Sequence, residues 1–181
     1  MRRDQDILRY GKFMAIDISL LNDKQILELR SAVEREARKR KLTFETGPLG
    51  EKIAIELFKN RPDLPVLTLA AAGTKNVDAL SRDGDRYSIK TIHRGRKTGT
   101  IYPDTENKDR QLFEYLVVIV LDEDYSLKRA ILMSWAQFCV SRSWDRRMNA
   151  WYVGKSEKAL SLGQQIFPSI PDYRISSKLS K

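Results

Sequence analysis

The sequence predicts a single α/β domain with a mixed central β-sheet of about five strands, flanked by helices. Hydrophobic residues recur at helical spacing before residue 60, whereas short apolar runs of strand length follow from residue 65 onward. The 181 residues are 41% hydrophobic and 31% charged, which is a globular composition at the length of one ordinary domain. We assign residues 1–20 to an N-terminal segment, 21–160 to the domain and 161–181 to a C-terminal tail.

Two helices are predicted in the first third of the chain. The first begins after a cap at Asn22 or Asp23 and runs to about Lys41. Its apolar stripe has spacings of three and four residues: Ile26, Leu29, Val33 and Ala37. The second helix begins at Pro48, a residue that suits a first helical turn, and Glu51 lies near its start.

The predicted strands follow residue 65. They cover residues 66–70, 77–80, 86–92, 114–121 and 127–133, with a further short strand at 150–153 and a short helix at 135–140. The turn at Asp83-Gly84-Asp85 separates two of these strands and predicts that they form a β-hairpin.

Composition excludes several classes of protein. The longest apolar run, Tyr115–Leu121, is too short for the roughly 18 residues that cross a bilayer, and the N-terminus lacks a secretory signal. We therefore expect a soluble, cytoplasmic protein with no membrane partner. A single cysteine, Cys139, and a single histidine, His93, argue against disulfides, zinc sites and Cys/His nucleophiles. A net charge of +9 predicts a polyanionic partner.

One group of residues has the composition of a phosphodiester-hydrolysing site. Side chains alternate along a strand, so Ser88 and Lys90 lie on the same face. The hairpin brings Asp78 beside them, and Glu51 is a candidate to complete the site from outside the sheet. Carboxylates of this kind hold Mg²⁺, which polarises a phosphodiester, while a lysine orients or deprotonates the attacking water or neutralises developing charge. Taken singly, each residue also has an ordinary structural explanation, such as a turn cap or a solvated strand residue.

The segments GPLGEKIAIELF (47–58) and KNVDALSRDGDRYSIKT (75–91) resemble the PD-(D/E)XK restriction-endonuclease-like superfamily. They are most similar to an uncharacterised restriction-endonuclease-like domain family with a Gly-Glu helix and the pattern D-A-x-x-x-D-G-x-x-Y-x-I-K. The resemblance continues through FEYLVVIVLDEDY and covers about residues 20–135.

This resemblance implies a role for each matching residue. Glu51 matches the helix glutamate, Asp78 the metal-binding aspartate and Lys90 the catalytic lysine of the family, and the backbone carbonyl of Ile89 is an implied metal ligand. The implied cofactor is Mg²⁺ or Mn²⁺ and the implied substrate is DNA. Because enzymes that cut both strands commonly act in pairs, the resemblance also implies a homodimer.

Ser88 departs from the family pattern, which usually has Glu, Asp or Gln at this position. Some restriction enzymes of the superfamily carry Ser-x-Lys and recruit a carboxylate from elsewhere. Here Glu51 is the best replacement, and Asp104 and Glu106 are weaker candidates. Three hypotheses for the function follow: a Mg²⁺-dependent DNA endonuclease of restriction or repair type, a catalytically weak or inactive DNA-binding module, or a structural or partner-binding protein.

Two basic groups suit a nucleic-acid partner, although a solvated surface is the ordinary alternative. Residues 86–103 contain basic residues and no acid: Arg86, Lys90, Arg94, Arg96 and Lys97, with His93 among them. We interpret this loop as a phosphate-contacting face. The second group is interleaved with aromatic residues: Arg142, Arg146, Arg147 and Lys155 with Trp144, Trp151 and Tyr152. We expect Trp135 and Trp151 to lie in the core and Trp144 to be exposed.

Overall fold

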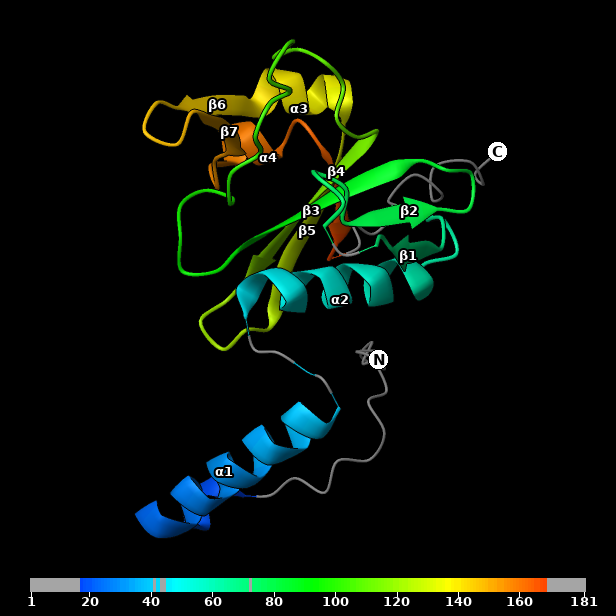
Figure 1. Cartoon of the computed structure of the whole chain (residues 1–181). Helices are drawn as coiled ribbons and strands as arrows, with labels where there is room; N and C mark the ends of the chain where they lie inside the picture. The colour runs from blue at the N-terminus through cyan, green and yellow to red at the C-terminus, as the bar shows by residue number, and fades with distance from the viewer. Residues whose placement is uncertain (1–16, 41, 43–44, 72, 169–181) are drawn as a thin grey trace, which may run out of the picture. The chain divides into compact units, whose positions relative to one another are not determined.

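The computed structural model of this chain describes residues 17–40, 42, 45–71 and 73–168 (Figure 1). The chain divides into two compact units, residues 1–43 and residues 44–181. The structure therefore sets the boundaries differently from the predicted domain of residues 21–160: the first predicted helix belongs to a separate unit, and the sheet extends past residue 160. Within the described ranges, no helix is both long and apolar enough to cross a membrane.

The first unit contains a 3₁₀ turn, η1 (Ile18–Leu20), and the helix α1 (Asp23–Lys39). Asn22 caps α1 through a reciprocal pair of hydrogen bonds. Its side-chain oxygen accepts from the backbone nitrogen of Gln25 at 3.0 Å, and the Gln25 side chain accepts from the backbone nitrogen of Asn22 at 2.9 Å. The predicted helix and its cap are confirmed as far as Lys39, while residue 41 lies outside the described residues.

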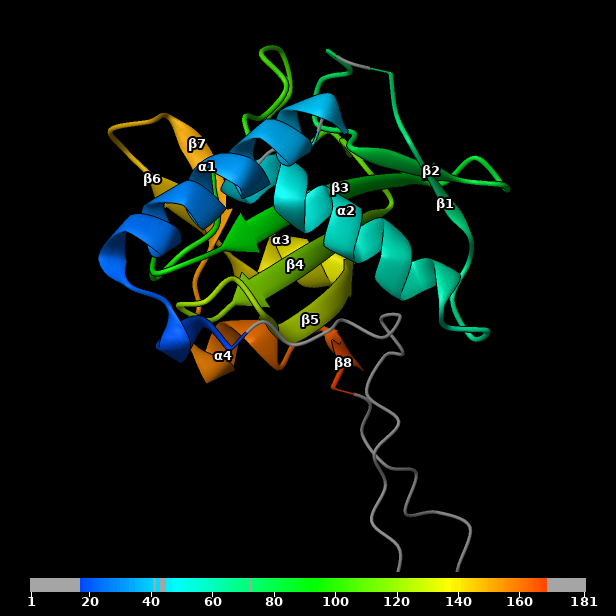
Figure 2. The ribbon, with the colours of Figure 1, turned by 90° about the horizontal axis from the view of Figure 1, so that it is seen from below.

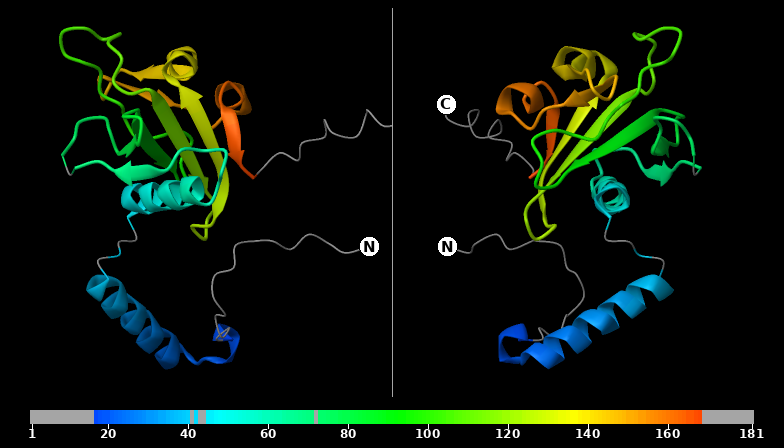
Figure 3. Two further views of the ribbon diagram at one scale, coloured as in Figure 1. Left: turned by 90° about the vertical axis from the view of Figure 1, so that its right-hand side faces the viewer. Right: turned by 60° about the vertical axis from the view of Figure 1, so that its left-hand side comes forward.

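The second unit is built on a mixed sheet, which confirms the predicted fold class (Figures 1 and 3). Among the described residues, six strands rather than about five pair in the order β1-β2-β3-β4-β5-β8. Only β3 and β4 are parallel, and the other neighbours are antiparallel. The strands are β1 (Leu67–Leu69), β2 (Ala79–Ser81), β3 (Arg86–Ile92), β4 (Tyr115–Leu121), β5 (Leu127–Ser134) and β8 (Gln164–Phe167).

Helices and a two-stranded ribbon complete the second unit. They are α2 (Thr46–Lys59), α3 (Trp135–Ser141), α4 (Glu157–Leu160) and the ribbon of β6 (Arg142–Asp145) and β7 (Ala150–Val153). The predicted tail of residues 161–181 is wrong for residues 164–167, because β8 pairs with β5 at the edge of the sheet. The strand β6 was also missed, since its charged and aromatic residues lack an alternating pattern.

The sheet has an apolar layer on each face, and α2 covers the face opposite to α3 and α4 (Figures 2 and 3). On the α2 side, Ala54 and Phe58 pack with Tyr87 and Ile89 of β3. On the other side, Ile92 packs with side chains from β4, β5, α3 and α4: Val118, Ile131, Phe138 and Leu160. The alternation of β3 therefore directs odd-numbered residues toward α2, and Ser88, Lys90 and Ile92 toward the opposite face.

Helix α2 approaches β3 most closely at Gly50. A Cβ atom added to Gly50 would lie 1.7 Å from the side-chain oxygen of Thr91, whereas one added to Gly47 meets nothing within 4 Å. Gly50 is buried, and the Thr91 hydroxyl is buried without a hydrogen-bond partner among the described residues. Only a glycine lets the helix backbone rest on this strand, and the next residue, Glu51, is close enough to Asp78 and Lys90 to interact with the charges of both.

Replacing Gly50 by alanine should therefore destabilise the protein by about 1–3 kcal/mol, the usual cost of overpacking a core contact. The matched control is Gly47→Ala in the same helix, which should stabilise it by about 0.5 kcal/mol because alanine favours helix. Urea denaturation of both variants measures the free energy of unfolding. Equal effects of the two substitutions would contradict the close packing at Gly50.

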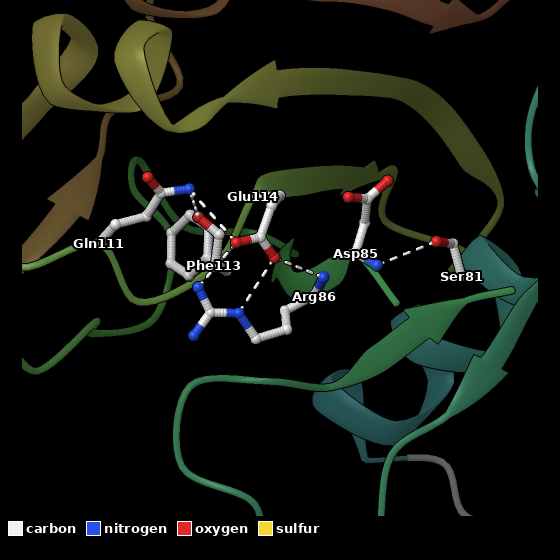
Figure 4. A network of polar contacts seen from close by, with 6 residues as sticks. All are labelled: Ser81, Asp85, Arg86, Gln111, Phe113 and Glu114. Carbon is white, nitrogen blue, oxygen red and sulfur yellow. Dashed lines mark hydrogen bonds and ion pairs between the residues drawn. The ribbon is translucent and has the colours of Figure 1, made fainter. Parts of the chain in front are cut away.

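The opposite end of β3 is fixed by an ion pair between Arg86 and Glu114 (Figure 4). The guanidinium donates to both carboxylate oxygens, at 2.7 and 3.0 Å, and the backbone nitrogen of Arg86 donates to the same carboxylate at 2.7 Å. The backbone nitrogen of Glu114 donates in return to the carbonyl of Arg86 at 2.9 Å. These bonds align the start of β3 with the start of β4, as the parallel register requires.

Glu114→Gln should lower the free energy of unfolding by about 1 kcal/mol at pH 7, because this partly exposed pair is screened by water. The hydrogen bond from Arg86 holds the pKa of Glu114 below its ordinary value of 4.5. The stabilisation is therefore present above pH 4.5 and is lost as the pH falls through the lowered pKa. The free energies of unfolding of wild type and Glu114→Gln, measured by denaturation between pH 7 and pH 3, should converge as the pH falls. Glu123→Gln, in an exposed turn, should match wild type at every pH.

Candidate active site

Asp78 lies immediately before β2, and its backbone is hydrogen-bonded to the strands on both sides. Its nitrogen donates to the carbonyl of Tyr87 at 2.8 Å, and its carbonyl accepts from the nitrogen of Ala70 at 3.0 Å. The predicted hairpin turn is present: Gly84, at φ 88°, donates to the carbonyl of Ser81 at 3.2 Å. Asp78 is thus held at a fixed position opposite β3.

Three groups of β3 converge on one carboxylate oxygen of Asp78. Oδ2 accepts from Ser88 Oγ at 3.2 Å, from the backbone nitrogen of Ile89 at 2.6 Å and from Lys90 Nζ at 2.9 Å. In the described part of the chain, nothing donates to Oδ1. The side chains of Asp78 and Lys90 are only 21% and 19% exposed, so water screens this ion pair weakly. One oxygen of Asp78 is therefore used for positioning, and the other remains available to a ligand.

The Lys90 ammonium also donates to the carbonyl oxygen of Ile89, at 3.2 Å. It therefore bridges the Asp78 carboxylate and the Ile89 carbonyl, two oxygens that the sequence analysis assigns to a metal. The ammonium of Lys90 therefore engages Oδ2 of Asp78 and the Ile89 carbonyl, and it leaves Oδ1 of Asp78 unengaged.

Glu51 lies in the first half of α2, close enough to this pair to interact with both of its charges. Partial burial raises the pKa of Glu51, the negative charge of Asp78 raises it further, and Lys90 acts in the opposite direction. A carboxyl group that senses both charges lies near both residues. The structure therefore brings together Glu51, Asp78, Ile89 and Lys90, which come from α2, the start of β2 and β3.

Ser88 and the other proposed replacements for the usual acid are placed differently. Ser88 is fully buried, so its hydroxyl orients Asp78 and does not face solvent. Asp104 accepts hydrogen bonds from the backbone of Glu106 and Asn107 at 3.0 Å, and these lower its pKa. Neither Asp104 nor Glu106 has a described contact with Asp78. Of the three carboxylates considered as replacements, Glu51, Asp104 and Glu106, Glu51 is the one whose charge interacts with that of Asp78.

The donor set at this site is suited to a hard divalent cation. The described residues contain no group of three or more His, Cys, Asp and Glu side chains arranged around one metal position. The available donors are instead the carboxylates of Asp78 and Glu51 and the carbonyl of Ile89, all of them oxygens. Mg²⁺ prefers oxygen ligands and commonly keeps several waters, so two carboxylates and a carbonyl are compatible with it.

The basic residues predicted to contact phosphate are in different situations. Arg86 is paired with Glu114, and Lys97 is paired with Asp145 and lies 4.5 Å over the ring of Tyr152. The His93 ring lies 3.9 Å from that of Tyr125. Arg94 and Arg96 are exposed and form no ion pair with any described residue. Of the predicted phosphate contacts on this loop, these two arginines are the ones with free side chains.

The loop after β3 is anchored on β7. The backbone nitrogen of Thr98 donates to the carbonyl of Val153 at 2.9 Å, and that of Lys155 donates to the carbonyl of Arg96 at 2.8 Å. This anchoring could not be predicted from the sequence, because the paired segments lie more than fifty residues apart. The loop that we interpret as a phosphate-contacting face is therefore held against the folded domain at these points.

The second basic group is organised by its aromatic residues. The Arg142 guanidinium lies 4.0 Å over the Trp151 ring and pairs with Asp109 at 2.7 Å. Trp151 packs partly buried against the core, as does Trp135. Trp144 is half-buried rather than exposed, because its ring lies 4.5 Å from that of Trp151 in an edge-to-face arrangement. Arg146 and Arg147, in the turn between β6 and β7, are exposed.

No protein-family model matches the sequence, and no curated protein has significant similarity to it. The geometry of the site and the charges around it are therefore the basis for a functional proposal.

Glu51→Gln should stabilise the protein at pH 7, because the substitution removes a charge that burial and Asp78 disfavour. A carboxyl with a raised pKa binds its proton more tightly in the folded state. Its ionisation therefore destabilises the fold as the pH rises above 4.5. The stability gained through Glu51→Gln should shrink below pH 4.5, where Glu51 of the wild type is protonated in both the folded and the unfolded state. Denaturation at pH 7 and pH 4 checks this, with exposed Glu56→Gln in the same helix as control. A Glu51→Gln variant less stable than wild type at pH 7 would contradict it.

Proposed function

We propose that this protein is a Mg²⁺-dependent DNA endonuclease of restriction or repair type, with a PD-(D/E)XK-like site. The observation that carries the proposal is the convergence of Ser88, Ile89 and Lys90 on one oxygen of Asp78, with Glu51 as a second carboxylate. A carboxylate pair beside a half-buried lysine, in a basic protein, suits hydrolysis of a polyanionic phosphodiester. The resemblance of residues 47–58 and 75–91 to that superfamily supports the same assignment.

In this proposal Asp78 Oδ1, Glu51 and the Ile89 carbonyl hold Mg²⁺ or Mn²⁺. The bound ion would supply Lewis-acid polarisation of the scissile phosphate. Ser88 keeps Asp78 oriented by donating to Oδ2, which leaves Oδ1 for the ion. Glu51 contributes the negative charge that the buried serine lacks, and a bound cation would offset the burial and the Asp78 charge that raise the pKa of Glu51.

Lys90 is the residue that faces the reacting phosphate in this proposal. Its ammonium is held by Asp78 at 2.9 Å and by the Ile89 carbonyl at 3.2 Å. From this position it can orient the attacking water and stabilise negative charge on the phosphate oxygens. Arg94 and Arg96, a few residues further along the chain, would neutralise flanking phosphates.

A catalytically weak or inactive DNA-binding module is the second candidate. It is favoured by the buried Ser88, which replaces a charged ligand, and by the Lys90 ammonium between the proposed metal ligands. In this alternative the basic residues bind DNA, and the site does not catalyse cleavage. A cytoplasmic location and a homodimer belong to either candidate, the latter from the resemblance alone.

Cleavage of supercoiled plasmid in Mg²⁺ or Mn²⁺ separates these candidates. Wild type should nick or linearise the plasmid. Lys90→Met and Asp78→Asn, which keep the shape of each side chain, should lower the rate about 100-fold or more, as expected on removing a catalytic proton donor or ligand. Circular dichroism should confirm that both variants remain folded.

Lys59→Gln is the matched control, since Lys59 is an exposed lysine of α2 with no described ion pair. It should cleave at the wild-type rate. Cleavage that survives both Lys90→Met and Asp78→Asn would refute the site. A wild type that binds DNA with strong salt dependence but does not cut it would instead support the inactive module.

A further inference from the structure

A cavity of about 450 Å³ lies at the far end of the sheet from α3, between β5, α4 and β8, and the proposed active site does not use it. Its volume falls in the range of small-molecule binding sites. Three of its lining residues are cations, Lys128, Arg129 and Lys155, and one is an acid, Glu157. The lining therefore carries a net positive charge of two, from residues in two separate segments of the chain.

Arg129 is the cation of this lining whose side chain is held by hydrogen bonds. Its side chain is only 20% exposed, and two acceptors fix its guanidinium: Gln165 Oε1 accepts from Nε at 2.8 Å, and Glu157 Oε1 accepts from Nη1 at 2.6 Å. A guanidinium has five N–H donors, so three remain without a partner among the described residues. A guanidinium held in place with unused donors is prepared to bind an anion with two oxygens.

The two lysines add charge that the fold leaves unpaired. Lys128 is exposed and Lys155 is half-buried, and neither forms an ion pair with a described residue. Glu157 neutralises part of the Arg129 charge, yet its side chain is 81% exposed and lies at the rim. Val120, Leu160 and Pro168 give the cavity an apolar portion. This combination suits a phosphate group attached to an organic part such as a sugar or base.

The sheet register relates the cavity to the proposed active site. Ile92 of β3 is aligned with Val120 of β4, and Val120 is aligned with Arg129 of β5. All three are on the face of the sheet that also carries Lys90. Two residues along a strand and two strand spacings separate the backbones of Lys90 and Arg129 by about 12 Å. The apolar layer beneath α3 and α4 covers the face between these two positions, so a bound strand that reached both would pass around this layer and would be longer than the backbone separation.

We infer that this cavity is a phosphate-binding site, formed by Arg129, Lys128 and Lys155, that holds a phosphate of the nucleic acid. The identification of the phosphate with nucleic acid rests on the proposed function, whereas the anion site itself rests on the cavity and its cations. The Arg129 guanidinium donates hydrogen bonds to two phosphate oxygens, and the lysines neutralise the remaining negative charge of the phosphate. The apolar side chains contact the attached sugar or base.

Binding of a fluorescein-labelled single-stranded 12-mer DNA, measured by anisotropy in EDTA, tests this site without cleavage. Lys128→Gln and Lys155→Gln should each weaken binding about three- to tenfold. Each should also reduce the slope of log K against log salt by about 0.7, as expected for the loss of one phosphate contact in single-stranded DNA. Lys59→Gln, with the same change of charge on the α2 side of the sheet, should leave both quantities unchanged.

The source of the phosphate is distinguished by competition with deoxyadenosine 5′-monophosphate. Displacement of the 12-mer at millimolar mononucleotide indicates a terminal phosphomonoester, and no displacement indicates an internal backbone phosphate. If Lys128→Gln and Lys155→Gln bind like Lys59→Gln, or if neither probe binds wild type, the inference is wrong. Cleavage by wild type with unaltered binding by the lysine variants would overturn this site alone. Loss of binding in those variants without any cleavage would overturn only the nuclease proposal.

Discussion

The parallel pairing of β3 and β4 is the constraint on which the rest of this structure depends. Parallel neighbours cannot be joined by a tight turn, so the chain must return from the end of β3 to the start of β4. Most proteins make this return with a helix. Here residues 93–114 contain no helix, and the backbone of this connection is bonded to β7 instead. Its basic residues are therefore displayed from an irregular segment that the folded body supports.

β3 also joins the two apolar layers to the candidate site. Its odd-numbered residues pack beneath α2, and its even-numbered residues carry Ser88 and Lys90. The same alternation that buries Tyr87 and Ile89 buries Ser88 completely, on the other face. A carboxylate at position 88 would be desolvated at considerable cost. The buried hydroxyl avoids that cost, and the negative charge is supplied from α2, where the close contact at Gly50 brings Glu51 within electrostatic range.

The sequence could predict the features that depend on local pattern. The bounds of β3, the turn at Gly84 and the cap at Asn22 followed from alternation and turn chemistry, and the structure confirms them. The convergence of Ser88, Ile89 and Lys90 on Asp78 was also predictable, because a hairpin joins residues that are close in sequence. Partners distant in sequence could not be predicted, because no local signal links Arg86 to Glu114 or Lys97 to Asp145. The edge strand β8 was missed because four residues after a glycine carry too little pattern.

The contact of Lys90 with both Asp78 and Ile89 has a consequence for how this fold is maintained. In zinc fingers and related small domains, the metal supplies the folding free energy, so the metal-free chain is unfolded. Here the partly buried carboxylate of Asp78 is neutralised by the ammonium of Lys90 from the same chain, at 2.9 Å. The negative charge of Asp78 is therefore balanced by a side chain that the pairing of two strands already brings to it, so this ion pair is part of the packing of β3 rather than an addition to it.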